Sequence, residues 1–288
     1  MEEKIVKSGT ADIYTNSIGQ GFPLIICDGL GCKGFAWKQL RPYLADHHQT
    51  IYWNYRGHGQ STLSKIQSDY TMDIVQQDLN AVLAAYNIQD AIFCGYSMGA
   101  LVSLAFALKN PERVSSLVSI CGTYGNPLNH MHDTDMVGKI FPHILSIVNT
   151  LPEHMIQRGW QWLASSKLIY YYFTLIEMKN ATDVESNLAK YFEHLSDMDL
   201  RAFLWTLAAI HNYSLKDELH NITTPTLILA GSRDTLAPVS VSEYMHKELP
   251  NNQFSIIDGV THVAMLEAAE FVQLRIEKFL RDRNIYGY

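Results

Sequence analysis

Short apolar runs alternate with amphipathic segments over the first 124 residues. The runs are bounded by glycine or polar residues and are typical of buried strands. The predicted strands are Pro23–Cys27, Thr50–Trp53, Ala91–Gly95 and Val114–Cys121, preceded by extended segments around Lys4–Lys7 and Ala11–Ser17. Helical spacing of apolar residues at Trp37–Ala45, Thr71–Asn87 and Ser97–Leu108 fills the intervals. Strands that alternate with helices predict a parallel sheet with right-handed crossovers.

The alternation stops between residues 125 and 217, where the sequence is helical in character and rich in large side chains. These are Trp160, Trp162, Tyr170, Tyr171, Tyr172, Phe173, Phe192 and Trp205. Strand and helix patterns then return as Thr226–Ala230, Val239–Glu248, Gln253–Ile257 and a closing helix near Met265–Arg281. We therefore predict an α/β sheet domain in two pieces, residues 1–124 and 218–288, with a helical insertion at 125–217.

Composition restricts the classes of protein that fit. Hydrophobic residues make up 47% of the 288 residues and charged residues 18%, which is typical of a packed globular core. A net charge of −7 without a basic run disfavours nucleic-acid binding. The charged N-terminus has no signal-peptide core, and no apolar stretch reaches the roughly 18 residues of a membrane span. We expect a cytoplasmic protein whose oligomeric state the sequence leaves open.

The four cysteines do not form a disulfide framework in a chain of this length. Cys94 and Cys121 each lie in or at the end of an apolar run that is predicted to be a buried strand. Cysteine packs as a small hydrophobe, so buried free thiols are the prediction.

The strongest chemical signal is Gly95-Tyr96-Ser97-Met98-Gly99, between a predicted strand and a predicted helix. A serine there occupies a strained turn that lifts its hydroxyl to the carboxyl edge of the sheet, and small neighbours allow the turn. The backbone N–H of Met98 then points at a developing oxyanion from the N-terminus of the helix. Ser97 is therefore the candidate nucleophile.

A serine hydroxyl needs a base, and His262 is the histidine best placed to act as one. It follows the last predicted strand and precedes a helix, at the edge where Ser97 is expected. Asp234 follows the preceding strand, and an acid there can orient the imidazole. Other histidines fall in polar or helical contexts and are expected at the surface: His47, His48, His154, His194, His220 and His246. The order Ser97, Asp234, His262 predicts a catalytic triad.

The second donor of an oxyanion hole is expected in the loop Cys27–Cys32, after the Pro23–Cys27 strand. The backbone N–H of Leu30 is the candidate, because Gly29 lets the chain turn close to the substrate.

Together these residues resemble the α/β-hydrolase superfamily over nearly the whole chain. The matching pieces are DGLG at Asp28–Gly31, YRGHGQS at Tyr55–Ser61, GYSMG at Gly95–Gly99, GSRDTLAP at Gly231–Pro238 and GVTHVAMLE at Gly259–Glu267. The resemblance implies a mostly parallel central sheet flanked by helices, with the insertion 125–217 as a helical cap. The chain departs from the family at Asp28, where histidine is usual, and at Asn54, where an acid is common. Within the YRGHG loop, Arg56 and His58 are expected to brace neighbouring loops.

Two other signals point to different chemistry and carry less support. Residues Gly29–Gly34 match G-x-G-x-x-G after a strand, but no acid follows about 20 positions on to hold a ribose. The run His130–Asp135 contains metal-type ligands without a partner pair elsewhere and is interpreted as a solvated loop.

The sequence therefore predicts a serine esterase that cleaves carboxylic esters of small to medium apolar acyl or aryl groups through an acyl-enzyme. It requires no metal or organic cofactor, and its partner is a small-molecule ester. Lactone opening or carbon–carbon hydrolysis on the same triad stay open, as does a ligand-sensing protein of this fold with slow turnover. The substrate-binding residues are not identifiable from the sequence.

Overall fold

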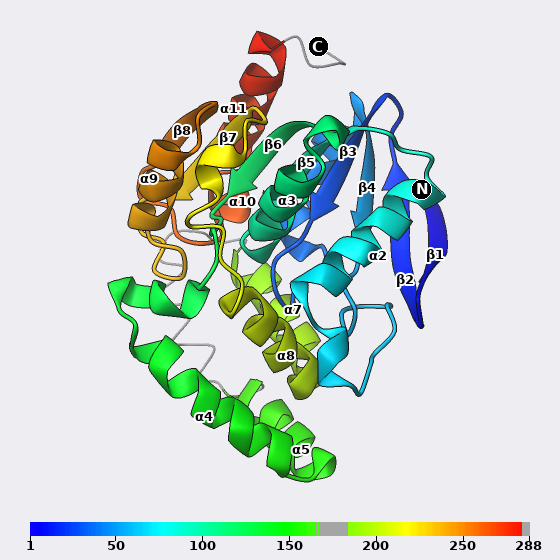
Figure 1. Cartoon of the computed structure of the whole chain (residues 1–288), viewed down its shortest axis with the longest axis vertical. Coiled ribbons are helices and arrows are strands. Elements are labelled where there is room, and N and C mark those ends of the chain that lie inside the picture. The colour runs from blue at the N-terminus through cyan, green and yellow to red at the C-terminus, as the bar shows by residue number, and fades with distance from the viewer. Residues whose placement is uncertain (165, 167–183, 284–288) are drawn as a thin grey trace.

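A computed structural model describes residues 1–164, 166 and 184–283, and in it eight strands form one twisted sheet (Figure 1). The strands are β1 Glu2–Ser8, β2 Ala11–Ile18, β3 Phe22–Cys27, β4 His48–Trp53, β5 Ala91–Tyr96, β6 Val114–Ile120, β7 Thr226–Gly231 and β8 Asn252–Ile257. Their spatial order is β1-β2-β4-β3-β5-β6-β7-β8. The pairs β1–β2 and β2–β4 are antiparallel, and the remaining pairs are parallel. This is the predicted mostly parallel α/β sheet.

Helices cover both faces of the sheet (Figure 1). They are α1 Leu40–Ala45, α2 Met72–Ala85, α3 Met98–Lys109, α9 Val239–Glu248, α10 Ala264–Glu267 and α11 Ala269–Asp282. Side chains of α2, α3 and α9 pack with Ile25 of β3 in one core, whereas α1, α10 and α11 pack with Leu24 and Ile26 in another. Successive strand residues point to opposite faces, so one apolar run supplies both cores.

Short 3-10 helices occur in the connecting loops: η1 Phe35–Trp37, η2 Gln67–Asp69, η3 Pro111–Arg113, η4 Pro127–Asn129, η5 Met131–Asp133 and η6 Leu219–Asn221. The helix predicted at Trp37–Ala45 is thus two elements, η1 and α1. The predicted closing helix is also divided, because Ala268 leaves helical geometry at φ −138° between α10 and α11. Thr71 caps α2 as predicted, since its hydroxyl accepts a hydrogen bond from the N–H of Ile74.

Four further helices lie between β6 and β7: α4 Met136–Thr150, α5 Glu153–Ala164, α7 Val184–Asp197 and α8 Leu200–His211. They extend beyond the carboxyl edge of the sheet (Figure 1). The chain leaves and re-enters the sheet domain at one place, where Gly125 bridges Ser214 and the N–H of Leu215 donates to the carbonyl of Tyr124 (2.8 Å). This pairing supports a proposed cap over 125–217. No helix in the described ranges is both long and apolar enough to cross a membrane.

The sheet has a topological switch at β3, which pairs with β4 on one side and β5 on the other. The connection after β3 runs through α1 on one face, and that after β5 runs through α3 on the opposite face. Loops that diverge in this way leave a crevice at the carboxyl ends of the strands, where α/β proteins bind ligands. The loop holding Leu30 follows β3 directly, and Ser97 follows β5.

A buried ion pair holds the loop after β4. Arg56 is 7% exposed and Asp78, on α2, is 1% exposed. The guanidinium makes two hydrogen bonds to the carboxylate, Nε to Oδ2 at 2.8 Å and Nη2 to Oδ1 at 2.9 Å, and Nη2 also donates to the carbonyl of Ser8 (3.0 Å). Arg56 therefore braces three segments, as the sequence predicted.

Removing one member of a buried ion pair leaves the other charge uncompensated. We expect Asp78→Asn to lower the free energy of unfolding by about 3 kcal/mol. The matched control is Asp73→Asn on the same helix, which breaks an exposed pair with Lys109 and should change stability by less than about 1 kcal/mol. Urea unfolding of both variants measures the difference, and equal losses would contradict the structural role of the buried pair.

Candidate active site

Ser97 sits in a strained turn between β5 and α3. Its φ of 54° and ψ of −116° are unusual for a residue with a side chain. Gly95 and Gly99 make the turn possible, because a Cβ on Gly95 would lie 2.4 Å from the carbonyl oxygen of Gly99. A Cβ on Gly99 would lie 1.9 Å from that of Cys27. The small residues predicted around Ser97 are therefore required by close backbone contacts.

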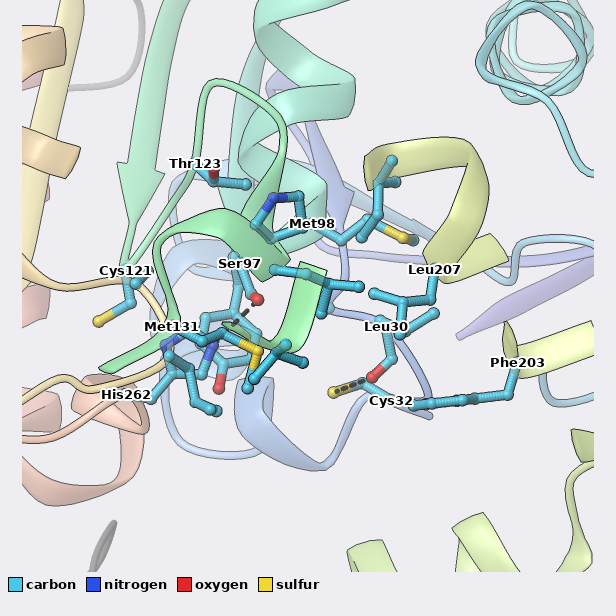
Figure 2. Close-up of a pocket in the computed structure, with 18 of the residues that line it drawn as sticks. Leu30, Cys32, Ser97, Met98, Cys121, Thr123, Met131, Phe203, Leu207 and His262 are labelled. Atoms are coloured by element: carbon cyan, nitrogen blue, oxygen red, sulfur yellow. Dashed lines mark hydrogen bonds between the residues drawn. The ribbon is translucent and has the colours of Figure 1, made fainter. Parts of the chain in front are cut away.

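The structure brings the three predicted residues of the triad together. His262 Nε2 lies 2.9 Å from Ser97 Oγ (Figure 2), and His262 Nδ1 lies 2.8 Å from Asp234 Oδ2. The other carboxylate oxygen of Asp234 accepts hydrogen bonds from the N–H groups of Leu236 (2.9 Å) and Ala237 (2.8 Å). Those bonds fix the carboxylate, and the carboxylate fixes the ring.

Glu267 holds the loop that carries His262, a role the sequence did not reveal. Its Oε2 accepts hydrogen bonds from the N–H of Thr261 at 2.7 Å and from the hydroxyl of Thr261 at 2.9 Å. The loops after β7 and β8 are also joined directly, since the N–H of Arg233 donates to the carbonyl of Val260 (2.9 Å). The only sequence signal for Glu267 was its place five residues after His262 in the GVTHVAMLE motif.

The two predicted oxyanion donors lie at the same edge. Met98 is the first residue of α3, and Leu30 is in the loop after β3. Both residues line the cavity next to Ser97. Within the described part of the chain, neither N–H is paired with a backbone or side-chain acceptor. Free N–H groups beside a nucleophile are the donors that an oxyanion hole requires.

His58 is buried behind the oxyanion loop and does not contact Ser97. Its Nε2 accepts a hydrogen bond from the N–H of Gly31 (3.1 Å), so the ring proton is on Nδ1, which donates to the carbonyl of Arg56 (2.9 Å). Burial lowers the pKa of His58 to about 4. The His58 ring therefore has a defined tautomer and stays neutral at physiological pH, which fits its predicted structural role.

The structure also tests the predictions for the cysteines, for His48 and for the run His130–Asp135. All four cysteines are buried and free, as expected for Cys94 and Cys121. The expectation of a surface position for His48 is wrong, because β4 begins at His48 and buries its ring completely. The run His130–Asp135 does not form a group of three metal-type ligands in the described residues.

A cavity of about 430 Å³ opens above Ser97. In Figure 2 His262 and Cys121 lie on one side of Ser97, and Leu30, Leu207 and Phe203 lie on the other. Residues of the insertion form much of the wall: Pro127, Leu128, Met131, Val137, Phe141, Ile144, Tyr191, Phe203, Leu204, Leu207 and Ile210. Among the described residues, the lining contains no aspartate, glutamate, lysine or arginine. The aromatic run Tyr170–Phe173 lies outside the described residues.

Comparison with known proteins assigns the family. Residues 23–269 match the family model described as alpha/beta hydrolase fold, and the chain belongs to that family. This places it among the hydrolases.

Two named relatives align with nearly the whole chain. It is 26% identical over 267 residues to 3-oxoadipate enol-lactonase 1 of Acinetobacter baylyi, covering 92% of this chain and 91% of the relative. It is 21% identical over 276 residues to pimeloyl-[acyl-carrier protein] methyl ester esterase of Legionella pneumophila, covering 94% and 100%. A hydrolase from Pseudomonas aeruginosa PA01 shares the fold with a TM-score of 0.78 at 19% identity, covering 96% of this chain and 98% of that one.

The low pKa of His58 makes folding stability depend on pH. The unfolded imidazole binds a proton near its ordinary pKa of about 6.5, whereas the folded ring stays neutral down to about 4. Stability from this residue is thus present above pH 6.5 and is lost as the pH falls towards 4. We expect a loss of about 2–3 kcal/mol between pH 7 and pH 4.5 that His58→Asn abolishes. Urea unfolding at both pH values measures it, with exposed His154→Asn as the control that should keep the full dependence.

Proposed function

We propose that this protein is a serine esterase that cleaves carboxylic esters with neutral, apolar acyl or aryl groups. The observation that carries the proposal is the unbroken hydrogen-bond chain from Ser97 through His262 to Asp234, opening on an apolar cavity. A pure ligand-binding protein has no need of three groups in this alignment. The alternative of a slow ligand sensor is therefore the weaker candidate.

In the proposed reaction Ser97 Oγ attacks the ester carbonyl while His262 Nε2 accepts its proton. Asp234 keeps the other ring nitrogen protonated and stabilises the imidazolium that forms. The N–H groups of Met98 and Leu30 donate to the oxyanion of the tetrahedral intermediate. His262 then returns the proton to the leaving alkoxide, and water hydrolyses the acyl-enzyme by the same steps in reverse order.

The cavity lining supports neutral substrates. An ionised group on the substrate would be taken out of water and, among the described lining residues, would find no cation to pair with. A volume of about 430 Å³ falls in the usual range for small-molecule sites and suits small to medium acyl groups.

Lactone opening is a second candidate on the same triad, because one relative is named an enol-lactonase. A lactone is a cyclic ester, so the proposed steps apply to it without change. Carbon–carbon hydrolysis has no observation of this structure in its favour. Turnover of matched linear esters and lactones with the same number of carbon atoms separates ester cleavage from lactone opening.

The nucleophile is testable by covalent labelling. A serine-reactive organophosphonate should add its phosphonyl group to Ser97, as detected by peptide mass spectrometry. Ser97→Ala should lose the adduct and at least a thousandfold in kcat/KM, while circular dichroism shows a folded protein. The control is Ser103→Ala in α3, the helix that follows Ser97; its hydroxyl donates to the carbonyl of Gly99, and Ser103 does not line the cavity. Ester turnover by Ser97→Ala at a comparable rate would refute the assignment.

Substrate charge provides an independent test. Methyl hexanoate and the monomethyl ester of adipic acid have the same reacting group and the same number of acyl carbons, and the second has a carboxylate in place of the terminal methyl group. Because a buried unpaired carboxylate costs several kcal/mol, we expect kcat/KM to favour the neutral ester by about 100-fold or more. Steady-state kinetics at pH 7.5 measure the ratio. Equal rates would show that the described apolar lining does not hold the acyl chain.

A further inference from the structure

We propose that Asp28 is the positioning residue of the oxyanion loop: its carboxylate holds residues 28–34 so that the N–H of Leu30 faces the reacting carbonyl oxygen. The inference rests on the proposed function of the site. Asp28 is 1% exposed, lies at the end of β3 and does not line the cavity, so it acts through the backbone and not on the substrate.

The carboxylate of Asp28 joins both ends of the loop. Its Oδ1 accepts hydrogen bonds from the N–H of Gly29 (2.9 Å) and from Trp37 Nε1 (3.0 Å). Its Oδ2 accepts from the N–H of Gly34 (2.8 Å) and from the hydroxyl of Tyr52 (3.1 Å). Two bonds go to the loop backbone, and two go to side chains on η1 and β4. The loop is thereby closed on itself and fixed to the sheet domain.

Further contacts fix the peptide group that contains the Leu30 N–H and the peptide group before it. The carbonyl of Asp28 accepts the hydroxyl of Tyr55 (3.0 Å), and the carbonyl of Gly29 accepts the N–H of Cys32 (3.2 Å). The Leu30 N–H belongs to the same peptide group as the Gly29 carbonyl, so its direction follows from that bond.

The next peptide group is held from the other side. The N–H of Gly31 donates to His58 Nε2, and the carbonyl of Leu30 accepts the hydroxyl of Tyr191 (3.5 Å). In the described structure the Leu30 N–H is thus left for an oxyanion, while the N–H groups of Gly29 and Gly31 on either side of it are occupied.

All four partners of the Asp28 carboxylate donate to it, and this arrangement favours the ionised form. The hydroxyl of Tyr52 accepts a hydrogen bond from Asn54 Nδ2 (3.0 Å) and so directs its own proton at Asp28. Burial raises the pKa of Asp28 above its ordinary value, and the four donors offset only part of that rise. A proton on the carboxyl would displace one of the four donors, so the geometry favours a carboxylate.

The four donors around residue 28 give a physical reason for an aspartate at this position, where a histidine is usual in the family. A neutral imidazole has one acceptor nitrogen and cannot receive four hydrogen bonds. An asparagine keeps the size of Asp28 but places an NH₂ group against two of the four donors. The substitution Asp28→Asn should therefore loosen one end of the loop without creating a cavity.

The test compares transition-state binding with substrate binding. For Asp28→Asn we expect kcat with the best ester to fall 10- to 100-fold and KM to change less than threefold, because only the oxyanion loses a donor. The affinity for a trifluoromethyl ketone, which forms the same tetrahedral oxyanion with Ser97, should fall by the same factor as kcat.

A stability control separates positioning from a general loss of folding. Phe279 is fully buried in α11, a helix that lies at the opposite end of the molecule from α4 and α5 in Figure 1. Phe279→Leu should lower the melting temperature while leaving kcat and ketone affinity unchanged. If Asp28→Asn lowers only the melting temperature, the proposal is overturned.

If Asp28→Asn does not fold, the variant Tyr52→Phe tests the proposal instead, because it removes one donor from Asp28 Oδ2. A three- to tenfold fall in kcat at constant KM is expected, and full kcat with full ketone affinity would overturn the proposal. Failure of the esterase function itself would appear in the unaltered protein, as absent turnover of every ester.

Discussion

The position of Ser97 depends on a backbone conformation that the rest of the sheet domain has to hold. Its φ and ψ values cost on the order of 1–3 kcal/mol relative to an ordinary turn. Packing of β5 between β3 and β6, and of α3 across them, offsets this strain, and the N–H of Ser97 donates to the carbonyl of Ile120 (3.0 Å). Once the turn is held, the hydroxyl lies at the carboxyl edge of the sheet. The loops after β3, β7 and β8 begin at the same edge, because these strands run parallel to β5.

The polar and apolar parts of the site come from different parts of the chain. The sheet domain supplies the buried polar groups, and those that shape the site are paired: Asp234 with backbone N–H groups and His262, Asp28 with four donors, Arg56 with Asp78. The insertion supplies mostly aliphatic and aromatic walls. Under the proposed function, the sheet domain performs the chemistry and the residues between β6 and β7 select the acyl group. Changes in the insertion can then alter the substrate without disturbing the triad.

The relatives fit this separation. A lactonase and a methyl ester esterase match nearly the full length of the chain at identities of 26% and 21%, so the fold is shared while the activities in their names differ. Opening a lactone and cleaving a methyl ester both pass through a tetrahedral oxyanion. We infer that hydrolases of this fold differ in the lining of the cavity and in the loops around it. In this chain, one of those loops is the Asp28 loop, which is held by a carboxylate.

The sequence by itself determined the order of strands and helices, the insertion between two halves of a sheet domain, and the residues Ser97, Asp234 and His262. Those features follow from local patterns: apolar runs of strand length, small residues around a turn, and polar residues directly after strands. The sequence did not reveal the four bonds of Asp28, the support of the His262 loop by Glu267, the burial of His48, or the insertion residues that reach the cavity. Each of these depends on which segments, distant along the chain, pack against each other. Hydrogen-bond partners and cavity walls are properties of that packing, which no short stretch of sequence contains.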